Sequence, residues 1–277
     1  MRRCGASLTA LPDQSPLRAG SGYVALVARL APADRELREL RELISWCRAR
    51  ESRIGYFAAL YTHVGEALER ALAQDVFEHP DELRRLNDAF FERYRAAVDA
   101  YRAGRPASAV WDVAFRAAHS HRPCVLQHLM LGMNAHINFD LAVAVADSID
   151  PADLPAFRPD FDRMNALLAG LVDGVARDLA LVWPLLSAVN RMFRSEDDVI
   201  IDFSMRRARE HAWAGAVALS VLSGAQRARA VAQLDATATA LAHEVVAARP
   251  PADVIAFLIR LGERGSVAEI IDDLLRP

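Results

Sequence analysis

The residues with the clearest potential for chemistry lie in one apolar stretch, between Gln127 and Asp140. His136 and Asp140 are four positions apart, so on a helix they share a face, where an imidazole nitrogen and a carboxylate oxygen could ligate one metal ion. Asn134 and Asn138 form a second polar row on the other side of the same helix. Burying such a group without a partner costs on the order of 2–7 kcal/mol. The spacing therefore predicts that neighbouring helices, or a ligand, meet these side chains.

Three interpretations of His136 and Asp140 follow from the residues alone. The pair could be a buried hydrogen bond that fixes helix packing, two ligands of a metal ion, or a metal-free acid–base pair. Asn134 and Asn138 could join two helices or orient a ligand. The spacing does not decide among these interpretations.

A second polar row falls on a helix expected to begin near residue 195. Asp198, Asp202, Arg209 and Trp213 lie within one narrow face of it. The carboxylates could ligate a metal, the guanidinium could bind an anionic group, and the indole could form the wall of a pocket. The alternative is a solvent-exposed face on which Asp202 pairs with Arg206 or Arg209.

Two further pairs repeat a spacing of three residues. His63 and Glu66 could add ligands to a metal held by His136 and Asp140, unless Glu66 faces solvent. Asp162 and Asn165 follow a proline-rich segment, where an N-terminal capping role for Asp160 or Asp162 is the alternative to ligation.

The elements that must position these residues are helices. No run alternates apolar and polar residues with β-branched enrichment, so the sequence predicts an all-α fold. Residues 1–22 are expected to be a flexible tail and residues 23–277 a single helical domain, a multi-helix bundle around a buried helix at about 122–147. Pro151, Pro155 and Pro159 predict a stiff connection before the helix at 160. Helices are expected at about 34–50, 55–75, 81–104, 107–119, 122–147, 160–185, 196–223, 225–249, 252–262 and 265–275.

Composition excludes several classes of function. All 33 basic residues are arginine, so chemistry that needs a lysine amine, such as a Schiff base or a P-loop, is excluded. A net charge of −3 without a basic stripe argues against nucleic acid. Three cysteines without a CxxC pair and an N-terminus without an apolar segment predict a cytoplasmic protein. Residues 124–146 are long and apolar enough to span a bilayer, but their polar groups favour a buried core helix, and we expect no membrane partner.

Four segments resemble an uncharacterised bacterial family of helical proteins, a domain of unknown function. They are QHLMLGMNAHINFDL at 127–141, LYTHVGEAL around Glu66, DFDRMNALL at 160–168 and AREHAW at 208–213, and GMNAHIN is the most specific. The resemblance spans about residues 50–220 and implies no activity. Gly65 and Glu210 depart from its pattern, where threonine and aspartate are usual, and His63 is not part of it. Its recurring positions match Glu66, Asn134, His136, Asn138, Asp140, Asp162, Asn165, Asp198, Arg209 and Trp213.

These patterns predict an enzyme that acts on a largely apolar small molecule, with a role in biosynthesis, in a pocket between the helices at 55–75, 122–147 and 196–223. Its chemistry would be metal-assisted, hydrolytic or oxidative, with iron or zinc as the divalent metal. The alternatives are a non-catalytic binding or scaffold protein, and a metal-free or magnesium-dependent cyclase or isomerase. The sequence leaves a homo-oligomer open. The expected catalytic residues are His136, Asp140 and Arg209, the substrate contacts are Asn134, Asn138, Tyr61, Asp162 and Trp213, and the metal ligands are His136, Asp140, Glu66, Asp198 and Asp202.

Overall fold

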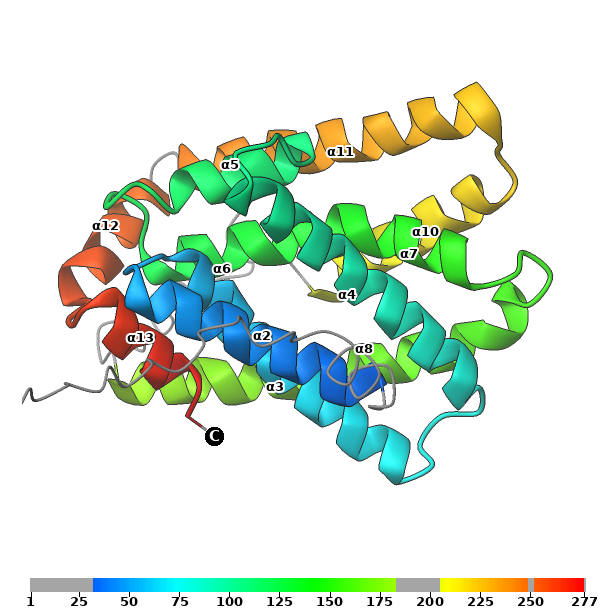
Figure 1. Cartoon of the computed structure of the whole chain (residues 1–277), viewed down its shortest axis with the longest axis horizontal. Helices are drawn as coiled ribbons and strands as arrows, with labels where there is room; N and C mark the ends of the chain where they lie inside the picture. The colour runs from blue at the N-terminus through cyan, green and yellow to red at the C-terminus, as the bar shows by residue number, and fades with distance from the viewer. Residues whose placement is uncertain (1–31, 183–204, 249–251, 277) are drawn as a thin grey trace, which may run out of the picture. The chain divides into compact units, whose positions relative to one another are not determined.

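The computed structural model describes residues 32–182, 205–248 and 252–276, and these residues form helices without any strand (Figure 1). The predicted all-α class is therefore confirmed. The helices are α2 (Pro32–Ala49), α3 (Ile54–Ala73), α4 (Pro80–Arg102), α5 (Ala109–Ala117), α6 (Val125–Met133), η1 (Asn134–Asp140), α7 (Leu141–Ser148), α8 (Leu154–Val182), α10 (Met205–Ser220), α11 (Gly224–Val246), α12 (Ala252–Gly262) and α13 (Val267–Leu274).

The central helix is continuous from α6 through η1 to α7, and η1 is a π-helix. Within it, the N–H of Leu141 bonds the carbonyl of His136, five residues earlier. A π segment is rare and is found frequently at functional sites. The seven π-helical residues run from Asn134 to Asp140 and thus carry the polar side chains that stand out in the sequence.

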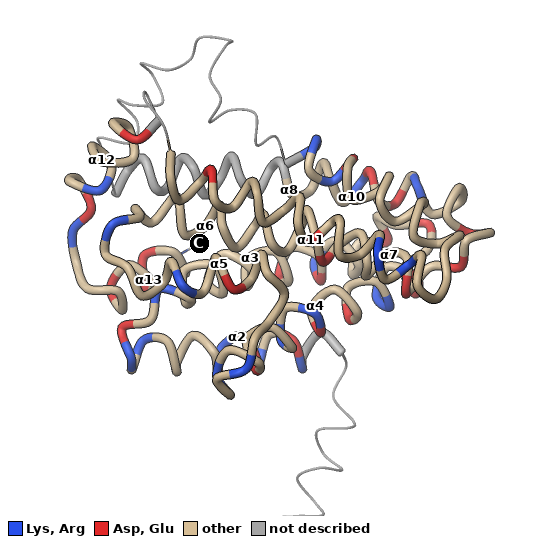
Figure 2. Tube along the Cα trace, turned by 90° about the horizontal axis from the view of Figure 1, so that it is seen from above, with Lys and Arg blue, Asp and Glu red and all other residues tan. Residues whose placement is uncertain are grey.

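Five helices pack against this central element, namely α3, α4, α5, α10 and α11. On one side, the core is rich in aromatic rings, among them Phe57, Tyr94 and Trp111. On the other side, Phe157 and Phe161 pack with the aliphatic residues of α7. Figure 2 shows charged residues along α2 and α4 and none along α6, as expected for a helix at the centre of the protein.

The proline-rich segment differs from the prediction. It was expected to be a stiff connection, but α8 begins at Leu154 and includes Pro155 and Pro159. Pro155 lies in the first turn, where no N–H is needed for the helix, and Pro159 faces solvent. The buried rings of Phe157 and Phe161 hold these turns against the core.

Asp160 does not cap its own helix. Its carboxylate oxygens accept hydrogen bonds from the backbone N–H groups of Glu78, at 3.0 Å, and His79, at 2.6 Å, directly before α4. This fully buried carboxylate therefore joins α8 to the start of α4, a role that local sequence could not indicate.

By length and composition alone, the helix at Val125–Ser148 could cross a membrane. In its most apolar window, however, 78% of the residues are buried inside the protein, which agrees with the predicted core helix. The predicted tail at 1–22, and Asp198 and Asp202 in the expected helix at 196–223, lie outside the described residues.

Candidate functional site

Asp140 lies at the centre of a buried hydrogen-bond network. Its Oδ1 accepts a bond from Arg93 Nε of α4 at 2.9 Å, and its Oδ2 accepts one from Trp111 Nε1 of α5 at 2.8 Å. The Nδ1 atom of His136 is 3.3 Å from the same Oδ2. Because a carboxylate accepts hydrogen bonds, this contact assigns the proton to Nδ1 and leaves the lone pair on Nε2. The predicted pair is thus a histidine oriented by an aspartate, both almost fully buried.

Aromatic rings enclose His136. The ring of Phe90 stacks on the imidazole with centroids 3.5 Å apart, and the ring of Tyr61 meets it edge-on at 4.8 Å. Burial lowers the pKa of His136, although its hydrogen bond with Asp140 acts in the opposite direction. The imidazole is therefore neutral at neutral pH, in apolar surroundings.

Three polar atoms around this ring have no hydrogen-bond partner among the described residues: His136 Nε2, Tyr61 OH and Tyr94 OH. Their rings come from three helices, and the centroids of the two tyrosines lie 5.8 Å apart. Burial holds the pKa values of both phenols well above the ordinary range, so both hydroxyls remain protonated. Since buried polar atoms are normally paired, this acceptor and these two hydroxyls have hydrogen-bonding capacity that no described residue uses.

Glu36 of α2 is a fourth such group, and it was missed in the sequence. One carboxylate oxygen accepts a bond from Asn87 Nδ2 at 2.6 Å, while Oε1 is buried without a partner among the described residues. Burial raises the pKa of Glu36 to about 7, against the lowering effect of the Asn87 amide. Its charge in turn raises the pKa of Tyr61. The signal was its spacing with Leu40 and Cys47 on the apolar face of the helix.

The amides of Asn134 and Asn138, unlike His136 Nε2, are hydrogen-bonded to other parts of the protein. Asn134 Nδ2 donates to the carbonyl of Ala238 on α11 at 2.8 Å, and Asn138 Nδ2 donates to Asn134 Oδ1 at 2.9 Å. Gln127 Nε2 also donates to α11, at the carbonyl of Val245, 2.7 Å away. These amides are used to hold α11 on the central helix, which favours the packing interpretation over ligand orientation.

Arg209 lies on α10, in a cluster with α8. Its guanidinium is buried, lies 4.5 Å from the ring centroid of Phe161 and donates from Nε to Asn165 Oδ1. Trp213 packs on Phe161 at 4.8 Å, whereas Asp162 is exposed and binds Arg158. Burial lowers the pKa of Arg209 to about 9, against a smaller raising effect of Asp162.

This cluster and His136 are close enough to interact electrostatically. The charge of Arg209 contributes to the lowered pKa of His136, and α10 packs directly against η1. Asp162 and Trp213 belong to the Arg209 cluster, and neither has a ring contact or hydrogen bond with His136.

The expected metal ligands are not brought together in the part of the chain that the structure describes. The carboxylate of Glu66 is 4.0 Å from the guanidinium of Arg41, and His63 Nε2 bonds the carbonyl of Leu274 at 2.8 Å. Asp140 uses its oxygens for Arg93, Trp111 and His136 itself. Among the described residues there is no group of three histidine, cysteine, aspartate or glutamate side chains that could hold a metal ion.

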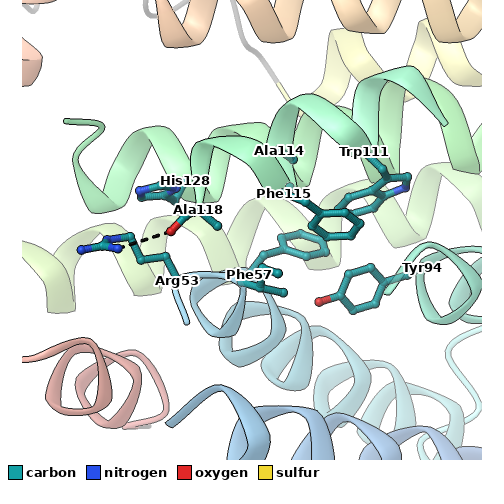
Figure 3. Close-up of a pocket in the computed structure, with 10 residues that line it drawn as sticks. Arg53, Phe57, Tyr94, Trp111, Ala114, Phe115, Ala118 and His128 are labelled. Carbon is teal, nitrogen blue, oxygen red and sulfur yellow. Dashed lines mark hydrogen bonds between the residues drawn. The ribbon is translucent and has the colours of Figure 1, made fainter. Parts of the chain in front are cut away.

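A small cleft adjoins the aromatic enclosure (Figure 3). Its empty space is about 290 Å³ when the adjoining open solvent is included, but the cavity volume open to a water-sized molecule is only about 20 Å³. Phe57, Tyr94 and Trp111 line the cleft and also contact the ring of His136, so these three rings separate the cleft from the imidazole. Arg53 and His128 lie at the other end. Sequence reasoning missed this cleft, because its lining comes from four separate helices.

The described residues thus define an all-α protein with an aspartate-oriented histidine on a π-helical turn of its core helix. The chain belongs to the family of unknown function DUF5995, whose model matches residues 34–248. This membership confirms the resemblance to an uncharacterised helical family. No curated protein and no solved structure matches the chain.

Proposed function

We propose that the protein is an enzyme that binds a small, largely apolar molecule beside His136 and transfers a proton with the imidazole, without a metal. One observation carries this proposal: His136 Nε2, Tyr61 OH and Tyr94 OH are buried in one aromatic enclosure without partners among the described residues. Structural polar groups in a core are normally satisfied, whereas groups that receive a substrate are left unpaired until it binds.

The arrangement suits the removal of a proton from a carbon next to a carbonyl group. Nε2 of His136 accepts the proton, and Asp140 stabilises the imidazolium through Nδ1–H. The electron pair of the broken C–H bond moves onto the carbonyl oxygen, where a tyrosine hydroxyl donates a hydrogen bond. In a substrate with a C=C bond next to the deprotonated carbon, the enolate extends over that bond. The electron pair on oxygen then re-forms the carbonyl group, the C=C bond shifts, and the far carbon of that bond takes the proton back from Nε2, which completes an isomerisation. This step needs no oxidant or other reactant.

Access to His136 requires movement of the rings that separate it from the cleft. Phe57 is the pivotal one, because its ring lies over Gly132, where an added Cβ would come within 2.4 Å of Phe57 Cγ. The substrate is proposed to enter from the cleft as Phe57, Tyr94 and Trp111 move apart. Ring rotations and small helix shifts of this kind are fast relative to typical turnover.

Two alternatives lead to different measurements. An iron- or zinc-dependent enzyme remains a proposal. In it, His136 Nε2 and an acid at 198 or 202 would bind the metal ion. The other ring nitrogen of His136, Nδ1, is held by a carboxylate, as in many metal sites. A scaffold protein would keep His136 closed at all times. The cytoplasmic location, the small-molecule partner and the lack of nucleic-acid and membrane partners remain predictions from the sequence.

The test is a phenol titration of ¹⁵N-histidine-labelled protein, treated with a chelator and followed by NMR. Phenol is apolar and can donate one hydrogen bond to Nε2. We expect His136 to have its proton on Nδ1 and its Nε2 signal to shift with phenol but not with anisole, which has the same shape without the donor. Comparison with the His136→Gln variant assigns the signal.

The scaffold alternative would be supported by two results together. The His136 signal does not shift with phenol up to the solubility limit of phenol, and the ring is not modified by diethyl pyrocarbonate in the native protein. A response that requires added iron or zinc would support the metal-dependent one. His211 is the internal control, because it is exposed and should respond equally weakly to both compounds.

A further inference from the structure

Arg209 is a buried ion that has no charged partner among the described residues. The residue is 3% exposed, and its hydrogen bond goes to the neutral amide oxygen of Asn165. Among the described residues, no carboxylate lies within the 4.0 Å of an ion pair. Two other buried ions are treated differently, since Asp140 pairs with Arg93 and Asp160 pairs with Arg163 at 2.6 Å.

Asp162, the described acid whose charge acts on Arg209, and Glu210, the neighbour of Arg209 in the sequence, are already engaged. Both oxygens of Asp162 bind Arg158 Nε, at 3.0 and 2.9 Å, and Arg158 Nη2 binds Glu210, at 2.7 and 2.9 Å. These side chains are at the surface, where solvent screens them. Asp162 and Glu210 therefore direct their oxygens to Arg158, and the charge of Asp162 acts on Arg209 only from a distance. Among the described residues, the groups that contact the Arg209 guanidinium are an aromatic ring and an amide.

A buried guanidinium in this state is unfavourable, and it stays protonated at neutral pH. An arginine that is buried for structural reasons is expected to have a carboxylate beside it. We propose that Arg209 is the binding site for the carboxylate group of a small molecule, with the two Nη groups as donors. The bound anion supplies the charge partner that the described residues do not.

The surroundings of Arg209 restrict the class of ligand. Phe161 lies beside the guanidinium, and the neighbouring apolar cluster includes Ile137 and Ala212. A single cation in apolar walls suits a monoanion with an apolar body, such as an aromatic or aliphatic acid. A phosphate would bring a second negative charge, and a sugar acid would leave hydroxyl groups unpaired in these walls.

Ile137 follows His136 directly, and the charge of Arg209 reaches the imidazole. An apolar body that extends from Arg209 past Ile137 would approach the enclosure around His136, which would make the bound acid the substrate of the proposed reaction. This last step rests on the proposed function, whereas carboxylate binding at Arg209 does not.

The test uses benzoate as the probe, with benzyl alcohol as its uncharged counterpart and the full-length protein as the receptor. Binding is measured from the arginine Nε–Hε signals in NMR and from the rise in melting temperature. We expect benzoate, and not benzyl alcohol, to shift the Arg209 signal and raise the melting temperature. Arg206→Met is the matched control, because it removes an exposed guanidinium from the same helix and should leave benzoate binding unchanged.

Arg209→Met should weaken benzoate binding at least tenfold while raising the urea midpoint of the free protein, because the unpaired buried charge is gone. Arg209→Lys, which keeps the charge without the planar fork, should bind benzoate more weakly and remain folded. An unchanged benzoate response in Arg209→Met, or unfolding of both Arg209 variants, would overturn the proposal. In His136→Gln the Arg209 signal should still respond, so failure of the anion site and failure of the proposed catalysis are told apart.

Discussion

Asp140→Ala tests whether the network around His136 is as complete as its geometry indicates. The substitution leaves Trp111 Nε1 and His136 Nδ1 as buried donors without an acceptor, at about 1–3 kcal/mol each. The third donor, Arg93, is 27% exposed in its side chain, so water replaces part of its lost bond. Together these terms predict a loss of about 3–5 kcal/mol, the range found when one partner of a buried ion pair is removed.

The measurement is urea unfolding at pH 7, followed by far-UV circular dichroism and by tryptophan fluorescence, with coincident transitions as the check on two-state behaviour. Asp162→Ala is the matched control: it also removes an aspartate bonded to an arginine, but at the surface, and should cost at most about 1 kcal/mol. If Asp140→Ala costs no more than the control, the carboxylate is solvated and the network does not exist as described.

The isosteric change Asp140→Asn separates charge from shape. The amide oxygen should take the Oδ2 position, because Trp111 Nε1 can only donate there, and the NH2 group then faces the donor Arg93. The ¹⁵N signals of His136 should therefore still show the proton on Nδ1, while the free energy of unfolding falls. A proton on Nε2 in this variant would mean that the amide has turned and that Trp111 does not fix its orientation.

Three further predictions concern buried groups in the same core. Glu36→Gln should leave the free energy of unfolding unchanged below pH 4.5 and raise it by up to about 3 kcal/mol above pH 7. The reason is that the pKa of Glu36 is about 7 in the folded protein, so the wild-type protein loses stability as the pH rises through about 7. Glu42→Gln, an exposed change on the same helix, is the control in urea unfolding. Burial lowers the pKa of His128 to about 3, so its contribution to the free energy of unfolding is present above pH 6.5 and is lost as the pH falls toward 3. His128→Gln should therefore reduce the change of the urea midpoint between neutral and acidic pH. Gly132→Ala should cost about 1–3 kcal/mol by overpacking against Phe57, and adding Phe57→Leu should recover part of that loss; a neutral Gly132→Ala would show that the ring moves freely.

The helices were predictable because their limits are encoded locally. The expected helix at 252–262 coincides with α12, and the expected 55–75 compares with Ile54–Ala73. The period of the apolar residues predicted where the helices run, and proline or glycine residues predicted where they end. The π segment was not predicted, since the apolar pattern was interpreted throughout with the 3.6-residue period of an α-helix. The helical Pro155 and Pro159 were missed because tertiary packing of Phe157 and Phe161 outweighs the local preference.

The candidate site was predictable only within one helix. The spacing of His136 and Asp140 indicated that the two side chains meet, and they do. Their partners could not be inferred, because Arg93, Trp111 and Phe90 come from helices whose rotation depends on the whole core. The same limitation explains Glu66: it pairs with Arg41 and takes no part in the contacts of His136. Helical spacing fixes which residues share a face, but not which neighbour that face meets.

The completeness of hydrogen bonding separates the structural polar groups of the central helix from the candidates for function. In the sequence, Gln127, Asn134 and Asn138 are polar residues of the apolar core helix, as His136 is. In the structure, each of the three amides has a protein partner on α11 or on its own helix. Asp140 is fully bonded too, and its removal should affect folding first. Among the described residues, Nε2 of His136 and Nε2 of His128 have no hydrogen-bond partner, and the Arg209 guanidinium has no carboxylate within 4.0 Å. A carboxylic acid with an apolar body could meet the requirements of His136 and Arg209 at once, which is why the two NMR titrations address the same molecule from opposite ends.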